Sequence, residues 1–486
     1  MQQVDISEPQ SWRGAVPGLL LILLAGVVGI GSAAWGPKML LPVFGVIVLG
    51  VVVARPEYGV ALLMSTFLMA YPTWMQGSGY LTLNNVLGGV LAALLVYTIY
   101  RDQNTWFLKV PEIQILLGLI LIYFFADTLN SPDPLQVALL GAGFYFAEGL
   151  RIFINRVAFT LFFVNYIRTP NHVRMIFMLA LAFMMITALT GVQSVLLGGG
   201  LKGYRAFTAT EELVAGQAGV IRAAGNPNRL AMFAVMAIIG MWFLMQQVRS
   251  SGLRFLFVPT IIMLALSVFL AASRSGLLGL IIAGGLIAID GGFDIRKLLT
   301  IAVSGALLVV VALQFVPERN LERILNLPGT EAAESGEGAA SLERRANSWE
   351  VAFMLWKEHP VLGVGMGNWA VARFLNDPGR SAGSPHNSYL MALIEGGPIA
   401  VLGFATLLLL TWRNIRFAEL YVTQPDFPLY DLRWIVKSAK VSLIVFTFFT
   451  FVADLWNLVI LYMLVGLAIT VRRQVELVIR REVYAY

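Results

Sequence analysis

The sequence contains no cysteine and only three histidines among its 486 residues. Without cysteine, the chain can form neither a disulfide framework nor an iron–sulfur or cysteine-ligated zinc site. His172, His359 and His386 lie far apart, and none has a second ligand at the spacing of a helical metal site. The sequence therefore predicts a protein with no metal and no other cofactor.

Charged residues are also scarce. They make up 13% of the chain, while hydrophobic residues make up 58%, whereas a soluble domain has about 25% charged and about 45 to 50% apolar residues. The mean hydropathy is +0.77, and apolar runs recur from Ala15 to Val471. These values exclude a sizeable soluble enzyme domain and predict an all-α, polytopic bundle of transmembrane helices.

Fourteen apolar stretches approach the roughly 20 residues that a helix needs to cross a bilayer. Three of them, at 58–72, 86–100 and 457–471, are short, so a bundle of about 12 spans is the alternative to 14. The stretches lie at 15–35, 38–54, 58–72, 86–100, 113–129, 149–167, 171–197, 229–247, 255–272, 275–290, 297–316, 387–412, 434–454 and 457–471.

The net charge of +6 would suggest nucleic acid as a partner of a soluble protein, but membrane topology accounts for it here. With the N-terminus inside and fourteen spans, 19 of the 34 lysines and arginines fall in inner loops and tails. Seven of the others lie in one long loop, where the positive-inside bias counts for little. We therefore expect both termini on the cytoplasmic side and no nucleic-acid partner.

This long polar segment runs from Pro317 to Pro385, on the predicted outer face. Its beginning, GTEAAESGEGAAS, has the composition of a flexible chain. Ser341 and Glu343 then predict a capped helix that ends before Pro360, and the glycine-rich LGVGMGNW predicts a tight turn before a second short helix. The apolar face expected for the first helix consists of Ala346, Trp349, Ala352, Phe353 and Trp356.

The predicted organisation has three parts. Residues 1–316 form transmembrane helices with an outer loop at 198–228, residues 317–386 form a periplasmic loop domain, and residues 387–486 form C-terminal helices with a basic cytoplasmic tail. Because the loop domain is the one sizeable polar insertion, we expect function there.

Four arginines lie near the predicted outer ends of spans. Arg156 lies inside the sixth stretch, Arg205 and Arg222 lie in the outer loop, and Arg274 lies between two apolar runs. Each one alone is explained equally well by snorkelling to phospholipid headgroups. Together, several guanidinium groups form a fork-shaped site for phosphate oxygens, which an enzyme acting on a lipid diphosphate requires.

His386 stands at the start of a predicted span, in SPHNSYLMALIEGG, on the outer side. Imidazole titrates near neutrality and can take a proton from an attacking hydroxyl, so His386 is a candidate general base. The alternative is a helix-cap histidine bonded to the backbone. Asn226 and Asn228, on either side of Pro227, are expected to cap the eighth span.

Three carboxylates lie in or near apolar stretches: Asp127, Glu395 and Asp454. Buried carboxylates usually pair with cations, so we expect them to pair with the outer arginines. The alternative is a proton relay in a transporter.

Three segments resemble the O-antigen ligase and polymerase superfamily: Arg274 in SRSG, the segment EHPVLGVGMGNW, and HNSYLMALIEGGPIAVLGF. They occur in the family's order between about Arg205 and Phe404, and the His-Asn-x-Tyr-Leu part is the most specific. The resemblance implies an inverting, metal-independent glycosyltransferase of the bacterial inner membrane. Such an enzyme takes a glycan from undecaprenyl diphosphate and passes it to an acceptor hydroxyl, such as that of the lipid A core, at the periplasmic face.

The resemblance implies that Arg222 and Arg274 hold the diphosphate and stabilise its charge as it leaves. It also implies that His386 is the general base. Arg205 is the alternative to Arg222 as the family's first arginine. The residues expected to bind the diphosphate or the glycan are Arg205, Arg156, Asn228, Asn387, Tyr389 and Glu395.

The sequence is also compatible with other functions. Polymerases of the same superfamily extend the glycan on its lipid carrier, and related enzymes transfer it to protein. The single long outer loop favours a ligase. A secondary transporter or flippase would show inverted repeats, and no such symmetry is evident. A structural membrane scaffold would have no use for the outer arginines and His386.

Overall fold

The computed structural model describes residues 40–68, 83–103, 105–130, 148–196, 227–290, 337–376 and 384–483, with scattered positions between 292 and 316. In these ranges every regular element is a helix, so the predicted all-α class is confirmed. The chain divides into two compact units, Met1–Gly59 and Val60–Tyr486.

The described part of the first unit holds α2 (Leu40–Ala54) and the start of α3 (Pro56–Leu68). α2 ends at Ala54 because Arg55 precedes a proline, whose ring disfavours helical backbone at the residue before it. Pro56 suits the first position of α3, where no backbone N–H is needed. Arg55 also forms an ion pair with Glu57, at 3.8 Å.

Seven helices in the described ranges are long and apolar enough to cross a membrane, because 20 residues of helix extend about 30 Å. The protein is therefore a polytopic α-helical membrane protein. The predicted total of 12 to 14 spans stays a prediction, since 15–35 lies outside the described residues and 297–316 is described only in part. The seven are α4 (Leu83–Asp102), α5 (Pro111–Asn130), α8 (Pro170–Leu196), α9 (Pro227–Met245), α10 (Ser251–Leu270), α17 (Ser388–Val422) and α18 (Arg433–Val452).

Two helices extend well beyond their apolar stretches. α17 continues to Val422, not 412, and α19 (Val459–Val483) continues past 471. Their extra turns are polar and carry ion pairs along the helix, Arg416 with Glu419 and Arg472 with Glu476. Such pairs stabilise exposed helix, so the helix continues where the hydropathy signal stops.

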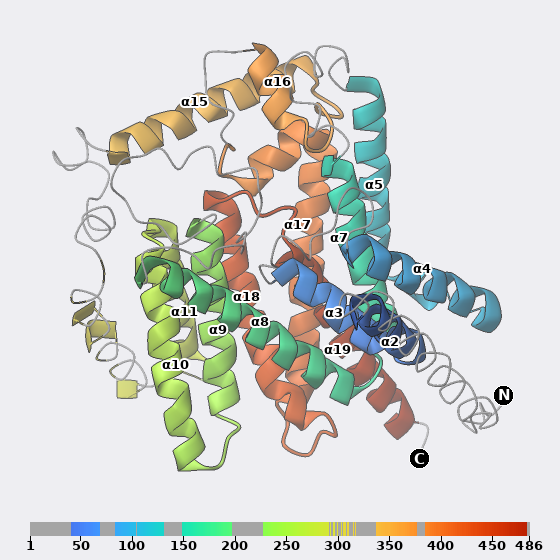
Figure 1. Cartoon of the computed structure of the whole chain (residues 1–486), viewed down its shortest axis with the longest axis vertical. Helices are drawn as coiled ribbons and strands as arrows, with labels where there is room; N and C mark the ends of the chain where they lie inside the picture. The colour runs from blue at the N-terminus through green and yellow to red at the C-terminus, as the bar shows by residue number, and fades with distance from the viewer. Residues whose placement is uncertain are drawn as a thin grey trace. The chain divides into compact units, whose positions relative to one another are not determined.

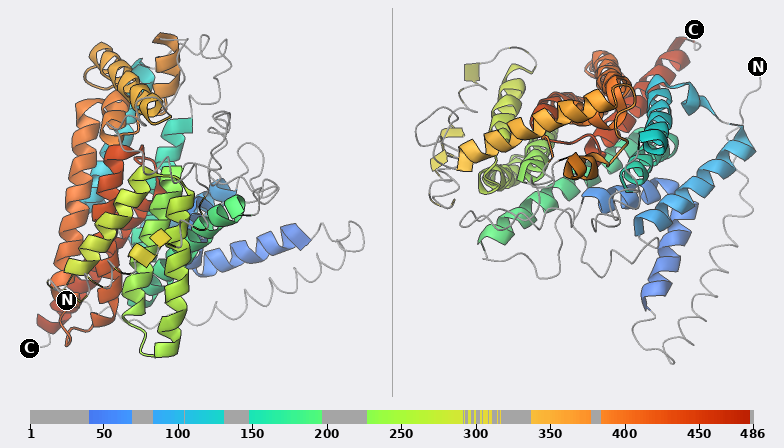
Figure 2. Two further views of the ribbon diagram at one scale, coloured as in Figure 1. Left: turned by 90° about the vertical axis from the view of Figure 1, so that its left-hand side faces the viewer. Right: turned by 90° about the horizontal axis from the view of Figure 1, so that it is seen from above.

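In the second unit, the starts of α9 and α11 (Arg274–Ile289) lie at one end of the helices, below the outer helix α15 (Glu337–Glu358) and α16 (Trp369–Asn376) (Figure 1). Figure 2 shows the same arrangement from above, with α15 over the end of the bundle that α9, α10 and α11 form. We call this the α15 end.

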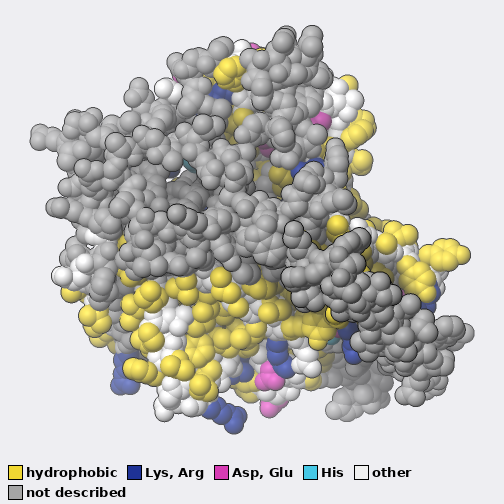
Figure 3. All heavy atoms as spheres, in the orientation of Figure 1, with side chains coloured by type: hydrophobic (Ala, Val, Ile, Leu, Met, Phe, Trp, Pro, Cys, Tyr) yellow, Lys and Arg dark blue, Asp and Glu magenta, His cyan; other side chains and the backbone are white. Residues whose placement is uncertain are grey.

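At the opposite end, Asp290 accepts hydrogen bonds from Lys437 at 2.7 Å and from Lys440 at 3.1 Å, which joins α11 to α18. Burial alone would raise the pKa of the Asp290 carboxyl, but the hydrogen bond and charge of Lys437, with the charge of Lys440, lower it. Lys440 also pairs with Glu419 of α17. Figure 3 shows apolar side chains over the lower part of α10, with Lys and Arg at this end.

The beginning of α15 differs from the prediction. The helix starts at Glu337, so residues 337–340, predicted as flexible, are helical and Ser341 lies inside the helix. Ala339 and Ala340 are strong helix formers, which explains the extension. The predicted end is confirmed: α15 stops at Glu358, two residues before Pro360, and α16 follows the glycine-rich turn.

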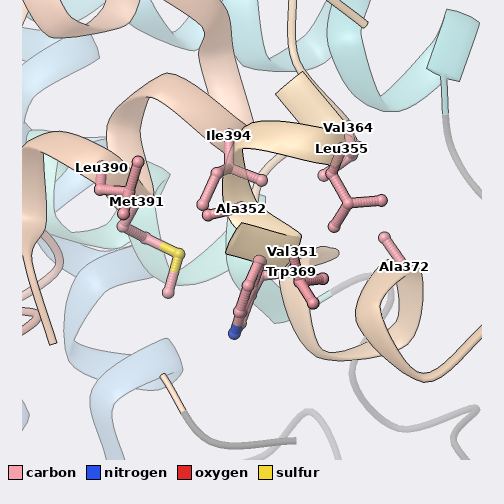
Figure 4. Close-up of a cluster of buried hydrophobic side chains, with 9 residues drawn as sticks. All are labelled: Val351, Ala352, Leu355, Val364, Trp369, Ala372, Leu390, Met391 and Ile394. Atoms are coloured by element: carbon pink, nitrogen blue, oxygen red, sulfur yellow. The ribbon is translucent and has the colours of Figure 1, made fainter. Parts of the chain in front are cut away.

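The predicted apolar face of α15 is buried at Ala352 and half-buried at Trp356 but is otherwise wrong. Trp349 and Phe353 are 43% and 45% exposed, whereas Val351 and Leu355 are buried. α15 carries apolar residues on more than one face, so periodicity alone did not single out the packed one. The face that packs belongs to a cluster with α16, α17 and the connecting loop (Figure 4), formed by Val351, Ala352, Leu355, Val364, Trp369, Ala372, Leu390, Met391 and Ile394.

α17 is broken at Gly397, whose φ of 67° lies in the left-handed region that favours glycine. Pro398 has no backbone N–H to continue the helical ladder. The carbonyl of Ile394 accepts a hydrogen bond from the N–H of Val364 at 2.8 Å, and that of Glu395 accepts one from Gly365 at 3.0 Å. The segment 361–368, which we call the glycine-rich loop, is thus bonded to the break.

This contact predicts a large effect of one methyl group. A Cβ at Gly397 would lie 1.9 Å from the carbonyl oxygen of Val361, and the left-handed backbone adds about 1–2 kcal/mol for a residue with a side chain. We expect Gly397→Ala to lower the melting temperature of the purified protein by several degrees or to prevent its accumulation. Thermal unfolding in detergent measures the effect.

Gly285→Ala is the matched control, because a Cβ there meets nothing within 4 Å and alanine favours helix over glycine by up to about 1 kcal/mol. We expect this variant to melt at the wild-type temperature or above. Equal melting temperatures for the two variants would contradict the close packing of the loop against α17.

Candidate active site

The starts of α9 and α11 are joined by hydrogen bonds. The Asn228 side-chain oxygen accepts from the hydroxyl of Ser273 at 2.7 Å and from that of Ser275 at 3.1 Å. Ser273 caps α11 by accepting the N–H of Gly276 at 3.0 Å. Asn228 was predicted to cap this helix, but it lies inside α9 and forms a bridge to α11 instead. Asn226 lies outside the described residues.

Arg156 of α7 (Glu148–Tyr166) is the first arginine of the site. Its Nε donates to the carbonyl of Asn457 at 3.1 Å, and its guanidinium carbon lies 3.9 Å from the centroid of the Phe67 ring. One terminal nitrogen is buried and has no hydrogen-bond partner in the described part of the chain. Arg229, next to Asn228, is close enough for its charge to act on Arg156.

A second pair of arginines consists of Arg274, at the start of α11, and Arg345 of α15. Arg345 of α15 is partly buried, and burial, followed by the positive charge of Arg274, lowers its pKa. Arg274 follows Ser273 and Arg229 follows Asn228, so the hydrogen bond between Ser273 and Asn228 brings the helix starts that carry these two arginines together. We call these four residues the arginine cluster: Arg156, Arg229, Arg274 and Arg345.

Arg156 and Arg274 were predicted from the sequence as ligands of a phosphate group, whereas Arg229 and Arg345 were not. The available signal for Arg229 was its place in GNPNRL, at the predicted start of a span. Arg205 and Arg222 lie outside the described residues, and their roles stay predictions. Guanidinium groups are well suited to phosphate oxygens, so these four arginines are candidate ligands for a phosphate group.

His386 lies at the same end, immediately before α17. Its φ of 53° is left-handed, a region that histidine tolerates better than most residues. Its N–H donates to the Ser384 hydroxyl at 3.2 Å, and the indole N–H of Trp349 in α15 donates to the carbonyl of Pro385 at 2.8 Å. The cap of α17 is Asn387, whose side-chain oxygen accepts two backbone N–H groups, so His386 is not the cap.

The residues after His386 are fixed to the connection between α18 and α19. Ser388 donates to the carbonyl of Ala453 and accepts the N–H of Leu455, both at 2.9 Å. The ring of Tyr389 packs with its centroid 4.8 Å from that of Phe451. These contacts give Asn387 and Tyr389 structural roles; that they also bind substrate stays a prediction.

Two of the three carboxylates, Glu395 and Asp127, are held differently from the prediction. Glu395 is 3% exposed, and its Oε1 accepts the backbone N–H of Gly367 at 2.9 Å. Asp127 accepts from the side-chain amide of Asn368 at 3.2 Å. Among the described residues no ion pair joins Glu395 or Asp127 to an arginine, because the glycine-rich loop turns its own N–H groups toward them. Glu395 therefore supports the loop, and a contact with substrate stays a prediction.

The fold defines a class: a polytopic α-helical membrane protein, here with several arginines and a histidine at one end of its helices. Residues 259–405 match the family model described as O-antigen ligase. This match confirms the predicted resemblance to the O-antigen ligase and polymerase superfamily over these residues and, at the level of the family, supports a glycan-transferring enzyme. Arg274, Arg345 and His386 lie within the matched segment. The comparison with curated proteins found no match.

Proposed function

We propose that this protein is a glycosyltransferase of the O-antigen ligase type, which moves a glycan from undecaprenyl diphosphate to a hydroxyl of the lipid A core or a comparable acceptor. One observation carries the proposal: the arginine cluster and His386 lie at the same end of the helices, and α15 contacts both. α15 carries Arg345, and its Trp349 donates to the residue before His386. These are the two parts that the chemistry needs.

In the proposed reaction, the His386 imidazole accepts the proton of the acceptor hydroxyl while the hydroxyl oxygen attacks the anomeric carbon. The bond from that carbon to the diphosphate oxygen breaks on the opposite face, so the configuration inverts. The diphosphate leaves with the electron pair, and the guanidinium groups of the arginine cluster stabilise its charge. Because these cations are part of the chain, the proposed reaction needs no divalent metal.

We assign the α15 end to the periplasmic face of the bacterial inner membrane, with both termini in the cytoplasm. Lys437 and Lys440 lie at the opposite end, where the positive-inside rule favours the cytoplasm. In this orientation α15 and the arginine cluster face the compartment where a lipid-linked glycan meets its acceptor.

A polymerase or a protein O-oligosaccharyltransferase would use the same donor and the same step with another acceptor. The single long polar segment, 317–386, favours the ligase. A transporter or flippase would release the glycan without forming a glycosidic bond. The acceptor and the product therefore separate these alternatives.

The test is transfer by purified protein, in the presence of EDTA, from an undecaprenyl-diphosphate-linked glycan to lipid A core, with products identified by mass spectrometry. We expect core-linked glycan and free undecaprenyl diphosphate in equal amounts. Elongated lipid-linked glycan without core attachment would identify a polymerase, and transfer only to an added acceptor protein would identify an oligosaccharyltransferase. No transfer to any acceptor would overturn the proposal.

A further inference from the structure

We infer that Glu395 of α17 carries a proton in the folded protein and, as a neutral acid, holds the glycine-rich loop against the break in α17. This makes Glu395 a positioning residue, which acts on the proposed reaction through the loop. Only its effect on glycan transfer rests on the proposed function, because the proton on Glu395 can be detected without any substrate.

The carboxyl group of Glu395 has few hydrogen bonds for a buried acid. Glu395 is 3% exposed, and its Oε1 accepts one hydrogen bond, from the backbone N–H of Gly367 at 2.9 Å. Its Oε2 is buried and has no hydrogen-bond partner within the described ranges. An ionised carboxylate can accept about four hydrogen bonds, and burying its charge without such partners is far less favourable than burying a neutral acid. The single N–H therefore favours the protonated form.

A second buried glutamate of the same helix shows the opposite arrangement. Glu419 is 8% exposed, and its carboxylate forms ion pairs with Arg416 and Lys440. Two cations thus offset the negative charge of that carboxylate. No lysine or arginine in the described part of the chain forms an ion pair with Glu395, so the feature that supports a charge on Glu419 is missing there.

The side chains around Glu395 are neutral or acidic. The ring of Tyr123 in α5 lies against the next residue of α17, since a Cβ at Gly396 would lie 2.6 Å from the Cε1 atom of the ring. Asp127 of α5 and Asp454, between α18 and α19, are close enough for their charges to act on Glu395. Neighbouring carboxyl groups disfavour ionisation of one another. Because both aspartates are partly exposed and Glu395 is buried, we place the proton on Glu395.

The glycine-rich loop, VLGVGMGN, has no titratable side chain of its own and is held through its backbone. Glu395 holds it twice, because its carboxyl group accepts from Gly367 and its backbone carbonyl also accepts from the loop. The loop joins α15 to α16, and its Val364 lies in the buried cluster with residues of α15 and α17 (Figure 4). α15 in turn donates a hydrogen bond to the residue before His386. The neutral acid therefore helps to position α15, and through it His386, without adding a buried negative charge.

The test is infrared spectroscopy of the full-length protein in a detergent that has no carbonyl group. A protonated carboxyl group has a C=O stretching band separate from the bands of carboxylates and of the peptide backbone, and this band moves to lower frequency in D₂O. We expect the band in the spectrum of wild type minus that of Glu395→Gln. Glu419→Gln is the matched control, and its difference spectrum should contain carboxylate bands only, because Glu419 is ion-paired. A Glu395→Gln difference spectrum with carboxylate bands alone would overturn the inference.

The positioning role is tested by rescue with the conservative variant. We expect Glu395→Ala to lower glycan transfer about 10- to 100-fold, since a displacement of the reacting groups by about 1 Å can have an effect of this size. Glu395→Gln should restore most of the activity, because its amide oxygen can accept from Gly367 and it adds no charge. The melting temperatures should follow the same order, with Glu395→Ala the lowest.

Glu395→Gln protein as inactive as Glu395→Ala would indicate an ionised carboxylate in contact with the substrate and would overturn the inference. A Glu395→Ala protein that melts and transfers like wild type would overturn the anchoring of the loop. Wild-type protein that has the protonated band, with the expected order of melting temperatures, but transfers no glycan would overturn the proposed function alone.

Discussion

Replacing His386 with asparagine is expected to reduce glycan transfer by about 10²- to 10⁴-fold, the usual contribution of a general base, while the protein stays folded. Asparagine adopts the left-handed backbone of this position readily, but its amide cannot take up the proton of the acceptor hydroxyl. The cap of α17 is made by Asn387 and is unaffected. Initial transfer rates at saturating donor and acceptor, with the melting temperature beside them, measure the effect.

Asparagine is a sharper choice than alanine, which at a φ of 53° costs about 1–2 kcal/mol of backbone strain and mixes a stability loss with the chemical one. His359→Asn is the control, because His359 follows the last turn of α15 and has no part in the proposed reaction. We expect this variant to transfer at the wild-type rate. A His386→Asn protein as active as the control would remove His386 from the mechanism.

Replacing Arg274 with alanine is expected to lower the turnover rate by about 10²- to 10³-fold, as removal of one donor from an oxyanion site does. The start of α11 persists, because Ser273 caps it and bonds to Asn228. Arg274→Lys keeps the charge but loses the two-pronged geometry, so we expect a smaller loss. Single-turnover rates with preformed enzyme–donor complex separate this effect from weaker donor binding.

The control for Arg274 is Arg254→Ala, which removes a guanidinium near the start of α10, at the opposite end of the helices. Arg254 donates to the carbonyl of Val248 at 2.6 Å and is exposed, so its loss should leave turnover within about 2-fold. Equal losses for Arg274→Ala and Arg254→Ala would indicate a general effect of charge on membrane insertion. Full activity of Arg274→Ala would exclude its proposed role.

The helices of the second unit were largely predictable, because a span of about 20 apolar residues is a direct physical requirement of the bilayer. What hydropathy could not predict is where polar turns continue a helix, as beyond 412 in α17. The packed face of α15 was also beyond it. Which of several apolar faces is buried depends on α17, and no local pattern contains that information.

The residues of the candidate site also differ in whether the sequence alone could predict their positions. Arg274 and His386 stand at the starts of predicted helices, so sequence alone could place them on one side of the membrane. Arg345 has an arginine directly before it in LERRAN, and only the packing of α15 brings it within range of the charge of Arg274. The carboxylate of Glu395 suggested a cationic partner, but it accepts a hydrogen bond from the backbone N–H of Gly367. Every residue except proline has a backbone N–H, so the sequence cannot show which one will be the donor.

The break in α17 has a consequence for how substrates arrive. At the buried residues Ile394 and Glu395 the carbonyls are bonded to the N–H groups of Val364 and Gly365, and a buried carbonyl that loses its partner is unfavourable. Swinging the loop aside would leave both carbonyls unsatisfied, at about 1–3 kcal/mol each. We therefore expect the loop to stay bonded to the helix break and not to act as a gate. In the proposed reaction, the donor and the acceptor would then reach His386 without opening of the helix break.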